Sequence, residues 1–406
     1  MKGIFVILDG VADQPCQSLG QLTPLQFAKT ENFDFFAYNG KIEYCYTVKE
    51  GFVPESGDAI VSLLGENYLD FERGSFEAWG LGMNLKNGDL AFRCNFGTIE
   101  DLESRKLLDR RAGRTLTTAE AEELAKTIRQ MVKLSFPFDF RISVQHRGVL
   151  IIKGGFSNNI SDVDSGKNDV LHFSEPLDEE EDSKLSAEIL NSFVRQSFEI
   201  LDKHPINLSR AKKGLFSANV VLCRGGGNKI PKFKKLKGSW AASVYMPLEI
   251  GIASSFGMDI FTFKYPELRD IDVYENLYSG LYKGIDNAIL MIKSNYKKYD
   301  YFFVHIKECD IPGHDNKPKE KVKMIEIIDK KLFGFLRGFI KSTKLIVTAD
   351  HTTACRMKEH TSDPVPVLVY PHPKGISEKK RFTEEDAMKG RRILGTKVLE
   401  EYMFRK

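Results

Sequence analysis

Hydrophobic residues in this chain gather in continuous runs at residues 4–8, 301–306 and 344–347, without alternation with polar residues. The runs are rich in β-branched and aromatic side chains, which is typical of strands buried on both faces of a parallel sheet. Segments with helical periodicity lie between the runs, and the first of them begins behind a Thr-Thr-Ala-Glu capping box. The alternation of strands and helices predicts an α/β fold. The expected helices cover 121–133, 185–201 and 321–340.

The middle of the chain has a different pattern. Shorter strands, at 91–96 and 147–153, are mixed there with helices, which is typical of an α+β domain. We therefore expect a mostly parallel three-layer α/β domain, formed by residues 1–70 and 232–406, that is interrupted by an inserted α+β domain at 71–231. A chain of 406 residues is long enough for two or three domains.

Composition narrows the classes of partner. The 59 Lys and Arg residues exceed the 56 Asp and Glu residues by three, too small a surplus to indicate nucleic acid or an anionic membrane as the main partner. No apolar stretch reaches the length of a membrane helix, and Asp9 interrupts the first run too early for a signal peptide. The six cysteines form no close pair, which indicates reduced, buried thiols and a cytoplasmic protein. A small anionic ligand remains compatible with this charge balance, and the oligomeric state is not indicated.

Each of the three predicted strands is followed within a few residues by an aspartate. Because the carboxyl ends of parallel strands lie at one edge of a sheet, these carboxylates are predicted to converge. Three histidines accompany two of them in sequence, and a set of carboxylates and imidazoles without cysteine suits divalent ions such as Mn²⁺, Zn²⁺ or Mg²⁺. A single Asp–His pair also occurs by chance, so it is the joint placement that favours a metal site. The candidate ligands are Asp9, Asp310, His314, Asp350, His351 and His360.

Two expectations concern the residues around these ligands. Pro312 and Gly313 predict that Asp310 and His314 lie on a loop and not on a regular helix. Four other histidines lack a comparable context, and we expect them to be core side chains satisfied by hydrogen bonds. They are His172, His204, His305 and His372.

Ser56 is a candidate nucleophile, because it lies in a turn-prone Pro-Glu-Ser-Gly-Asp segment before an apolar helix. A serine hydroxyl bound to a metal ion loses its proton easily, so no histidine base is needed. By itself the serine is equally typical of a helix N-cap. The two roles are compatible, since a helix N-terminus also stabilises a phosphate. These residues predict an enzyme that transfers a phosphoryl group through Ser56.

Several segments are together similar to one family. They are Asp9-Gly10, the Ser56 segment, residues 88–96 (GDLAFRCNF), 109–114 (DRRAGR), His146-Arg147, 218–225 (ANVVLCRG) and 360–366 (HTSDPVP). With them the chain resembles, nearly from end to end, the archaeal type of 2,3-bisphosphoglycerate-independent (cofactor-independent) phosphoglycerate mutase, a branch of the alkaline phosphatase superfamily.

The resemblance implies a metal-binding phosphatase-like domain interrupted by a substrate-clamping domain. It implies two divalent ions (Mn²⁺, Zn²⁺, Mg²⁺ or Co²⁺) and no 2,3-bisphosphoglycerate cofactor. By family pattern, one ion is held by Asp310, His314 and His360, and the other by Asp9, Ser56, Asp350 and His351. Ser56 is expected to take the phosphoryl group from phosphoglycerate and return it to the neighbouring hydroxyl while the inserted domain keeps water out. The substrate-binding residues implied are Arg93, Asn95, Asp109, Arg111, Arg114, Arg147 and Arg224, although any of these arginines could instead be a surface side chain.

Three positions depart from the family pattern. Ile60 stands where a histidine is usual, Glu249 where a lysine is usual, and Ser254 where an arginine is usual. A lysine at 249 would neutralise the transferring phosphoryl group, and a glutamate would repel it, so Lys235 or Lys237 are alternative sources of that charge.

The leading hypothesis is the interconversion of 3-phosphoglycerate and 2-phosphoglycerate in glycolysis and gluconeogenesis. The alternative is a phosphohydrolase or a kinase-like small-molecule phosphotransferase on the same scaffold, which the changes at Glu249 and Ser254 favour. A third possibility is a non-catalytic, metal-stabilised interaction protein. Retention of all seven ligand types argues against it.

Overall fold

The larger sheet of the protein is built around the three predicted strands. The computed structural model describes residues 2–166, 170–269, 272–371 and 380–405. Its central strand β1 (Gly3–Leu8) pairs in parallel with β10 (Tyr301–Ile306) on one side and with β11 (Lys344–Thr348) on the other. All six residues of β1 are buried. Burial of both faces explains why the apolar runs do not alternate with polar residues.

The complete sheet has eight strands in the order β15-β2-β14-β11-β1-β10-β8-β9. Strand β14 (Val365–Tyr370) is antiparallel to β11 and to β2 (Lys41–Tyr46). The remaining strands are parallel to their neighbours: β8 (Trp240–Ser243) pairs with β10, β9 (Asp259–Phe261) with β8, and β15 (Arg392–Leu394) with β2. The prediction of a mostly parallel sheet is therefore confirmed.

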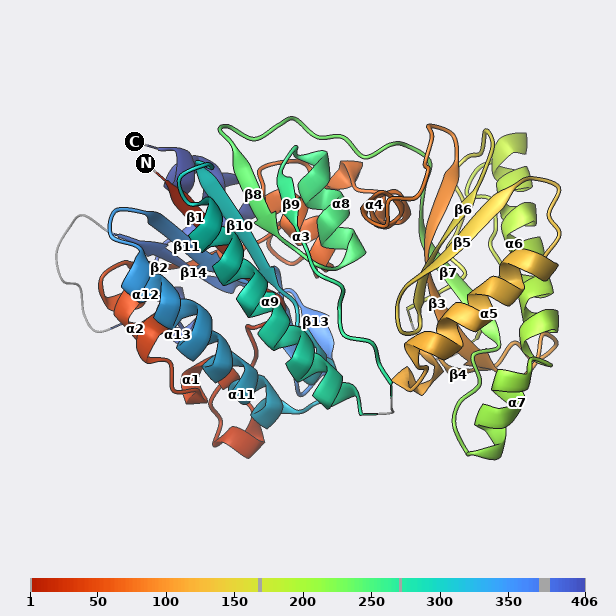
Figure 1. Cartoon of the computed structure of the whole chain (residues 1–406), viewed down its shortest axis with the longest axis horizontal. Coiled ribbons are helices and arrows are strands. Elements are labelled where there is room, and N and C mark those ends of the chain that lie inside the picture. The colour runs from red at the N-terminus through yellow and green to blue at the C-terminus, as the bar shows by residue number, and fades with distance from the viewer. Residues whose placement is uncertain (1, 167–169, 270–271, 372–379, 406) are drawn as a thin grey trace.

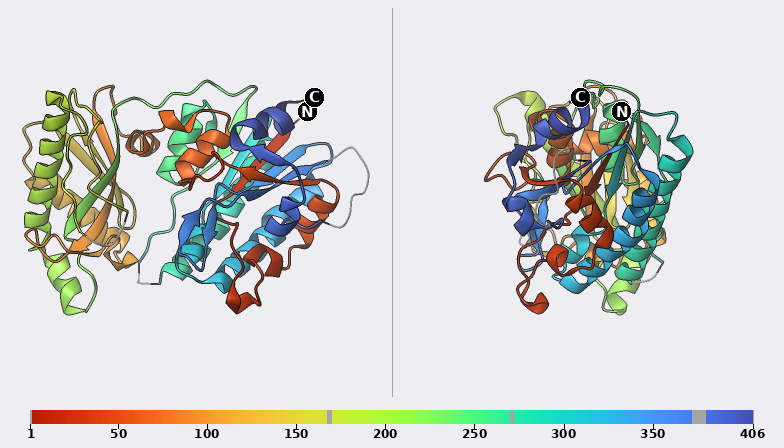
Figure 2. Two further views of the ribbon diagram at one scale, coloured as in Figure 1. Left: turned by 180° about the vertical axis from the view of Figure 1, so that it is seen from behind. Right: turned by 90° about the vertical axis from the view of Figure 1, so that its left-hand side faces the viewer.

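Helices lie on both faces of this sheet (Figures 1 and 2). The face toward the viewer in Figure 1 carries α2 (Glu31–Tyr38), α9 (Val273–Asn295), α11 (Pro318–Ile328) and α12 (Gly334–Phe339). The view from behind in Figure 2 shows α3 (Ser56–Leu63) on the opposite face, where it contacts α8 (Pro247–Ser255). This is the predicted three-layer α/β arrangement. Shorter helical segments are α1 (Pro24–Phe27), α13 (Glu384–Met388) and two π-helical turns, at Asp329–Phe333 between α11 and α12 and at Leu399–Phe404.

A second, antiparallel sheet is formed by the central part of the chain. Its strand β3 (Leu90–Ile99) pairs with β6 (Arg147–Ile152) and β7 (Val220–Gly227). The remaining pairs join β4 (Leu107–Asp109) to β3 and β5 (Phe138–Val144) to β6. Helices α5 (Thr118–Met131), α6 (Glu181–Leu201) and α7 (Pro205–Lys212) accompany this sheet, whose apolar residues form a core distinct from that of the larger sheet (Figure 1). The predicted α+β character of this region is confirmed. Across the described ranges, no helix is both long and apolar enough to span a bilayer.

Helix α4 (Arg73–Gly80) lies between the two sheets and packs against α8 through two glycines (Figure 1). A Cβ on Gly80 would lie 1.8 Å from the carbonyl oxygen of Pro247, and a Cβ on Gly251 would lie 2.0 Å from that of Phe76. Only glycine allows the two backbones to approach this closely. The contact fixes the position of α8 relative to the second sheet.

We expect the substitution Gly251→Ala to lower the free energy of unfolding by about 1–3 kcal/mol, because the added methyl group overlaps backbone atoms of α4. Gly338→Ala is the matched control, since Gly338 is an exposed helical residue of α12 with no atom within 4 Å of its Cβ position. There alanine should stabilise the protein by about 0.5–1 kcal/mol. Urea denaturation measures both changes, and equal effects of the two substitutions would contradict a special role for the α4–α8 contact.

Candidate metal centre and anion-binding cleft

The structure brings together the three aspartates that follow the central strands. Asp9 follows β1, Asp310 lies just beyond β10 and Asp350 just beyond β11. The backbone N–H of Gly10 donates to Asp350 Oδ1 at 3.0 Å, so the ends of β1 and β11 are joined directly. Asp9 and Asp350 are fully buried. Three carboxylates thus lie at one edge of the larger sheet, as the parallel order of the strands predicts.

These carboxylates form two groups with histidines. Ligand atoms of Asp310, His351 and His360 lie within 4.8 Å of one another, and so do those of Asp9, His305 and Asp350. His314 belongs to the same site, because its Nε2 lies 3.4 Å from Asp310 Oδ2. The hydroxyl of Ser56 lies 3.2 Å from His351 Nε2 and 3.5 Å from Asp9 Oδ2. All seven predicted ligands therefore share one site.

The orientation of the histidine rings fits metal ligands. His314 Nδ1 lies 2.8 Å from the carbonyl oxygen of Lys358, and His360 Nδ1 lies 2.9 Å from that of Pro54. His351 Nδ1 is engaged by the Thr353 hydroxyl at 3.0 Å. In each ring the Nδ1 contact leaves Nε2 directed at the carboxylates, which is the usual arrangement around a bound metal.

Unpartnered buried atoms give a second test of this fit. Asp9 Oδ1, Asp350 Oδ2 and His305 Nε2 are buried and have no hydrogen-bond partner among the described residues. Burial first, and then the charge of Asp350, raise the pKa of the Asp9 carboxyl well above its usual range. A divalent cation would satisfy these atoms and relieve the repulsion between the carboxylates.

The prediction that Asp310 and His314 lie on a loop is wrong. They are the first and last residues of the one-turn helix α10 (Asp310–His314). Pro312 is tolerated in this first turn because the first backbone N–H groups of a helix have no intrahelical partner. The four-residue spacing then places both side chains on the same face of the helix.

The prediction of satisfied core histidines is only partly correct. It is wrong for His305, whose unpartnered Nε2 lies 3.7 Å from Asp9 Oδ2 and 4.0 Å from Asp350 Oδ2. His172 is exposed, so it is not a core side chain. His204 is hydrogen-bonded as expected but only half-buried, and its Nδ1 accepts from the N–H of Ile206 at the start of α7. His372 lies outside the described residues.

Ser56 is the first residue of α3, and the N-cap position is taken by Glu55. Glu55 and Asp58 form the capping box of this helix, so the serine side chain is not used as a cap. Its hydroxyl is therefore free to face the histidines and carboxylates. Ile60, one turn further along α3, is fully buried in apolar surroundings.

Lys307 lies at the nucleophile and was not identified from the sequence. Its Nζ forms an ion pair with Asp9 Oδ2, and it lies 3.2 Å from Ser56 Oγ and 3.1 Å from Glu249 Oε1. Burial lowers the pKa of Lys307, but Asp9 and Glu249 more than offset this effect, so its pKa is raised and the ammonium is retained. Its position one residue after β10, at the same edge as Asp310, is the signal that could have identified it.

None of the other residues considered from the sequence supplies positive charge next to Ser56. Ser254 is half-buried on α8, and neither Lys235 nor Lys237 is among the described residues that line the cleft next to Ser56. Glu249 faces the site through Lys307. The positive charge beside the nucleophile therefore comes from Lys307, just after β10, and not from the lysines before β8.

A cleft of about 1120 Å³ lies between the metal-ligand cluster and the second sheet. Ser56, Asp310, His314 and His360 line one side of it. The predicted residues that line it are Arg93, Asp109, Arg111, Arg114, Arg147 and Arg224. Asn95, which shares a face of β3 with Arg93, is buried and does not line it. Arg73 and Arg110 also line the cleft and were missed from the sequence.

The arginines on this wall repel one another. Burial, followed by the charges of Arg114 and Arg147, lowers the pKa of Arg111 to about 9. Burial and the charge of Arg224 lower the pKa of Arg93 as well. Arg110 differs, since it donates to both carboxylate oxygens of Asp164, at 2.7 and 2.9 Å. An anionic ligand would relieve the repulsion between the guanidinium groups of this wall.

Two of the predicted substrate-binding residues have structural partners. Asp109 Oδ1 accepts hydrogen bonds from the backbone N–H groups of Arg111 at 2.7 Å and Gly113 at 2.8 Å, so it shapes the turn that presents the arginines. Arg114 forms an ion pair with Asp315 across the cleft, and the Tyr274 hydroxyl donates to the other oxygen of Asp315 at 2.9 Å. Arg114 therefore joins the second sheet to the loop behind His314.

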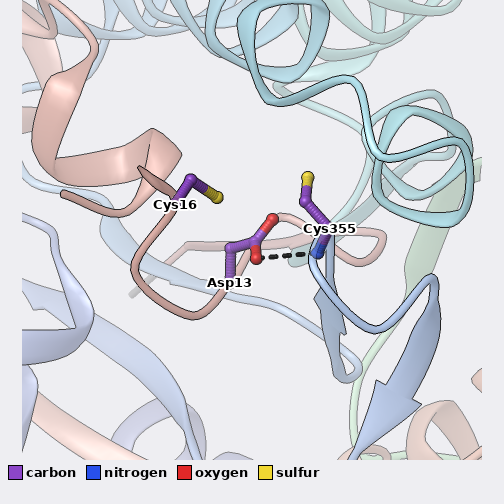
Figure 3. A group of neighbouring side chains, drawn as sticks. All are labelled: Asp13, Cys16 and Cys355. Carbon is purple, nitrogen blue, oxygen red and sulfur yellow. Dashed lines mark hydrogen bonds between the residues drawn. The ribbon is translucent and has the colours of Figure 1, made fainter. Parts of the chain in front are cut away.

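A third cluster, of Asp13, Cys16 and Cys355, lies outside the cleft (Figure 3). The two thiols lie on either side of Asp13, and Asp13 Oδ1 accepts the backbone N–H of Cys355 at 2.9 Å. The buried ammonium of Lys321 lies 2.8 Å from Asp13 Oδ2 and supplies the compensating charge. The cluster thereby connects the loop after β1 to the chain beyond His351. All six cysteines are buried free thiols, as predicted.

Comparisons with known proteins agree on one family. A model described as 2,3-bisphosphoglycerate-independent phosphoglycerate mutase matches residues 37–207, and a model of the metalloenzyme superfamily matches residues 274–392. The chain is 39% identical over 400 residues to the 2,3-bisphosphoglycerate-independent phosphoglycerate mutase of Pyrococcus abyssi, covering 96% of this chain and 93% of that protein. It is 37% identical over 415 residues to the enzyme of the same name from Methanosphaera stadtmanae, covering 98% and 96%.

Solved structures give the same result over the whole chain. A protein of Pyrococcus horikoshii superimposes with a TM-score of 0.75 at 30% identity, covering 99% of this chain and 96% of that one. The cofactor-independent phosphoglycerate mutase of Thermoplasma acidophilum gives a TM-score of 0.57 at 27% identity, covering 99% of both chains. The chain therefore belongs to the archaeal type of 2,3-bisphosphoglycerate-independent phosphoglycerate mutases, within the metalloenzyme (alkaline phosphatase-like) superfamily.

Proposed function

We propose that this protein interconverts 3-phosphoglycerate and 2-phosphoglycerate through a phosphoserine formed at Ser56. The observation that supports this most directly is the position of the Ser56 hydroxyl, 3.2 Å from His351 Nε2 and 3.5 Å from Asp9 Oδ2, in a cleft whose opposite wall is made of arginines. Relatives that share more than a third of their residues with this chain carry the name of this activity.

Two divalent ions, of Mn²⁺, Zn²⁺, Mg²⁺ or Co²⁺, complete the proposed site. Asp310, His314 and His360 would hold one ion, and Asp9, Ser56, Asp350 and His351 the other. When bound, such ions lower the pKa of the serine hydroxyl and neutralise charge on the phosphoryl group. No 2,3-bisphosphoglycerate is needed, because Ser56 itself stores the phosphoryl group.

The chain's own residues account for the remaining steps. The arginine wall binds the carboxylate and phosphate of the substrate, since planar guanidinium groups pair bidentately with both. Ser56 Oγ forms a bond to phosphorus as the bond from phosphorus to the glycerate oxygen breaks. After the glycerate reorients, its neighbouring hydroxyl attacks the phosphoserine and Ser56 Oγ is the leaving group. The N-terminus of α3 stabilises the phosphate while it is held on Ser56.

We further propose that residues 71–231 are an inserted, substrate-clamping domain and that 1–70 with 232–406 are the phosphatase-like domain. Separate sheets and separate apolar cores support this division. The Arg114–Asp315 ion pair and a 3.0 Å hydrogen bond from Gln145 to Asn276 connect the two parts across the cleft. Such closure protects the phosphoserine and the glycerate from water.

Hydrolysis or transfer to another small molecule is the alternative function. Glu249 favours it, because a buried carboxylate near the nucleophile repels a phosphoryl group. The ammonium of Lys307 lies between Glu249 and Ser56, however, and restores a positive charge at the point of transfer. The mutase therefore remains the better-supported function.

Replacing the nucleophile tests this function. We expect Ser56→Ala to lower the interconversion rate, followed by coupling to enolase, by about 10⁴-fold or more. Ser62→Ala is the matched control, since Ser62 is a buried serine of the same helix outside the metal cluster, and it should keep the rate of the unmodified protein. If Mn²⁺-loaded protein releases inorganic phosphate from phosphoglycerate and forms no 2-phosphoglycerate, the hydrolase replaces the mutase.

The arginine wall predicts opposite effects at two adjacent residues. Arg111→Met should weaken phosphoglycerate binding by about 10- to 100-fold, because one charged hydrogen-bonding partner is lost, without lowering the melting temperature of the free protein. Arg110→Met should destabilise the protein by about 3 kcal/mol, because the buried Asp164 loses both hydrogen bonds from Arg110 and keeps only the more distant Arg224, at 3.9 Å. Calorimetric titration and thermal denaturation measure the two properties. Destabilisation by Arg111→Met would show that this arginine is a structural residue.

A further inference from the structure

The Lys307 ammonium lies among three oxygen-bearing side chains at the floor of the cleft. It pairs with Asp9 Oδ2, and it lies 3.1 Å from Glu249 Oε1 and 3.2 Å from Ser56 Oγ. The lysine side chain is 18% exposed and lines the cleft. An ammonium has three N–H donors, so Lys307 can donate to Asp9 and Ser56 while its charge also faces Glu249.

Glu249 depends on this contact. Its side chain is 2% exposed on α8, and neither carboxylate oxygen has a hydrogen-bond partner among the residues that the structure describes. Burial raises the pKa of Glu249, but the Lys307 ammonium more than offsets this, so the pKa is lowered and the carboxylate is charged. An ionised carboxylate is stable in such surroundings only with a cation beside it.

Asp9 takes part in two competing interactions. Its carboxylate belongs to the group with His305 and Asp350 that could hold a cation, and it also pairs with Lys307. A divalent ion bound to Asp9 would lie close to the Lys307 ammonium, and the two positive charges would repel one another. Glu249 is not part of either metal-ligand group, so it remains available to Lys307 when Asp9 is occupied.

We propose that Lys307 and Glu249 form an internal counter-ion pair that sets the charge at the nucleophile. In the metal-free protein Lys307 neutralises Asp9, and in the metal-bound protein Glu249 retains the ammonium beside Ser56. There the Lys307 ammonium donates a hydrogen bond to Ser56 Oγ, the atom that attacks and later leaves phosphorus. Lys307 is then a catalytic residue and Glu249 a positioning residue. The inference rests on the proposed function, because it assigns a metal ion to Asp9.

This arrangement predicts that the two variants shift metal affinity in opposite directions. Lys307→Met removes the competing cation and should tighten Mn²⁺ binding about tenfold, while it slows turnover. Glu249→Gln leaves the ammonium without its second partner and should weaken Mn²⁺ binding about tenfold, and it also slows turnover. Loss of native structure would weaken binding in both variants, so it cannot imitate this pattern.

Calorimetric titration of Mn²⁺ into chelator-treated full-length protein gives the affinities, and the enolase-coupled assay gives kcat and KM. Glu249→Asp should recover part of the loss in kcat caused by Glu249→Gln, because it restores the charge that holds Lys307. Lys323→Met is the control, since Lys323 is an exposed lysine of α11 that pairs with Glu320, and it should change neither property. The double variant Lys307→Met/Glu249→Gln removes both members of the pair, so neither is left as a buried charge without the other, and it tests the pair even if one single variant does not fold.

Two results would overturn the proposal in distinguishable ways. If Lys307→Met and Glu249→Gln both leave Mn²⁺ affinity unchanged, or shift it in the same direction, the counter-ion pair is wrong while the metal site stands. If Asp9→Asn binds Mn²⁺ as tightly as the unmodified protein, the metal assignment fails, and the proposed function fails with it. Opposite shifts, with an intermediate affinity in the double variant, are the expected result.

Discussion

The crowding of negative charge at one edge of the larger sheet is the constraint on which the site depends. Three adjacent parallel strands end in Asp9, Asp310 and Asp350, and two of these carboxylates are fully buried. Parallel pairing fixes their separation, so the carboxylates cannot move apart to lower their repulsion. Two of the histidines add ligand atoms but little positive charge, since burial holds the pKa of His305 at about 3 and lowers the pKa of His351. Cations bound at this edge would offset the crowded negative charge.

The opposite wall of the cleft has an excess of positive charge. Its arginines extend from the second sheet and from the turn that Asp109 shapes, and burial with mutual repulsion lowers the pKa of several of them. On each wall, groups of the same charge lie close together and repel one another. An anionic phosphate ester between them, with metal ions on one side and guanidinium groups on the other, satisfies both at once. Contacts across the cleft, such as Arg114 with Asp315, hold the two walls at a distance that suits a small ligand.

Much of this could be predicted from the sequence, because it depends on local patterns. The apolar runs identified the central strands, and the rule that parallel strands end at one edge brought the three aspartates together. Other features depend on contacts between distant segments. His305 lies within a strand, and whether its ring faces the metal ligands or the core depends on the neighbouring strand ends. Pro312 suggested a loop because its compatibility with a first helical turn is visible only once α10 has a defined start. Asn95 matched a family position and shares a face of β3 with Arg93, but its side chain is buried and does not line the cleft, which only the packing of neighbouring side chains decides.

Glu249 shows why a substitution must be judged by its surroundings. As an isolated change from lysine it reverses the charge next to the phosphoryl group, and in the sequence it favoured the alternative of a phosphohydrolase or phosphotransferase. In the structure the carboxylate meets Lys307, the residue after β10, so the two charges sum to zero, and of the two groups it is the ammonium that contacts Ser56. The close packing of α8 on α4 through Gly80 and Gly251 keeps the carboxylate at that position. Helix α8 therefore links the two features. Its Gly251 packs against α4, and its Glu249 holds Lys307 beside Ser56.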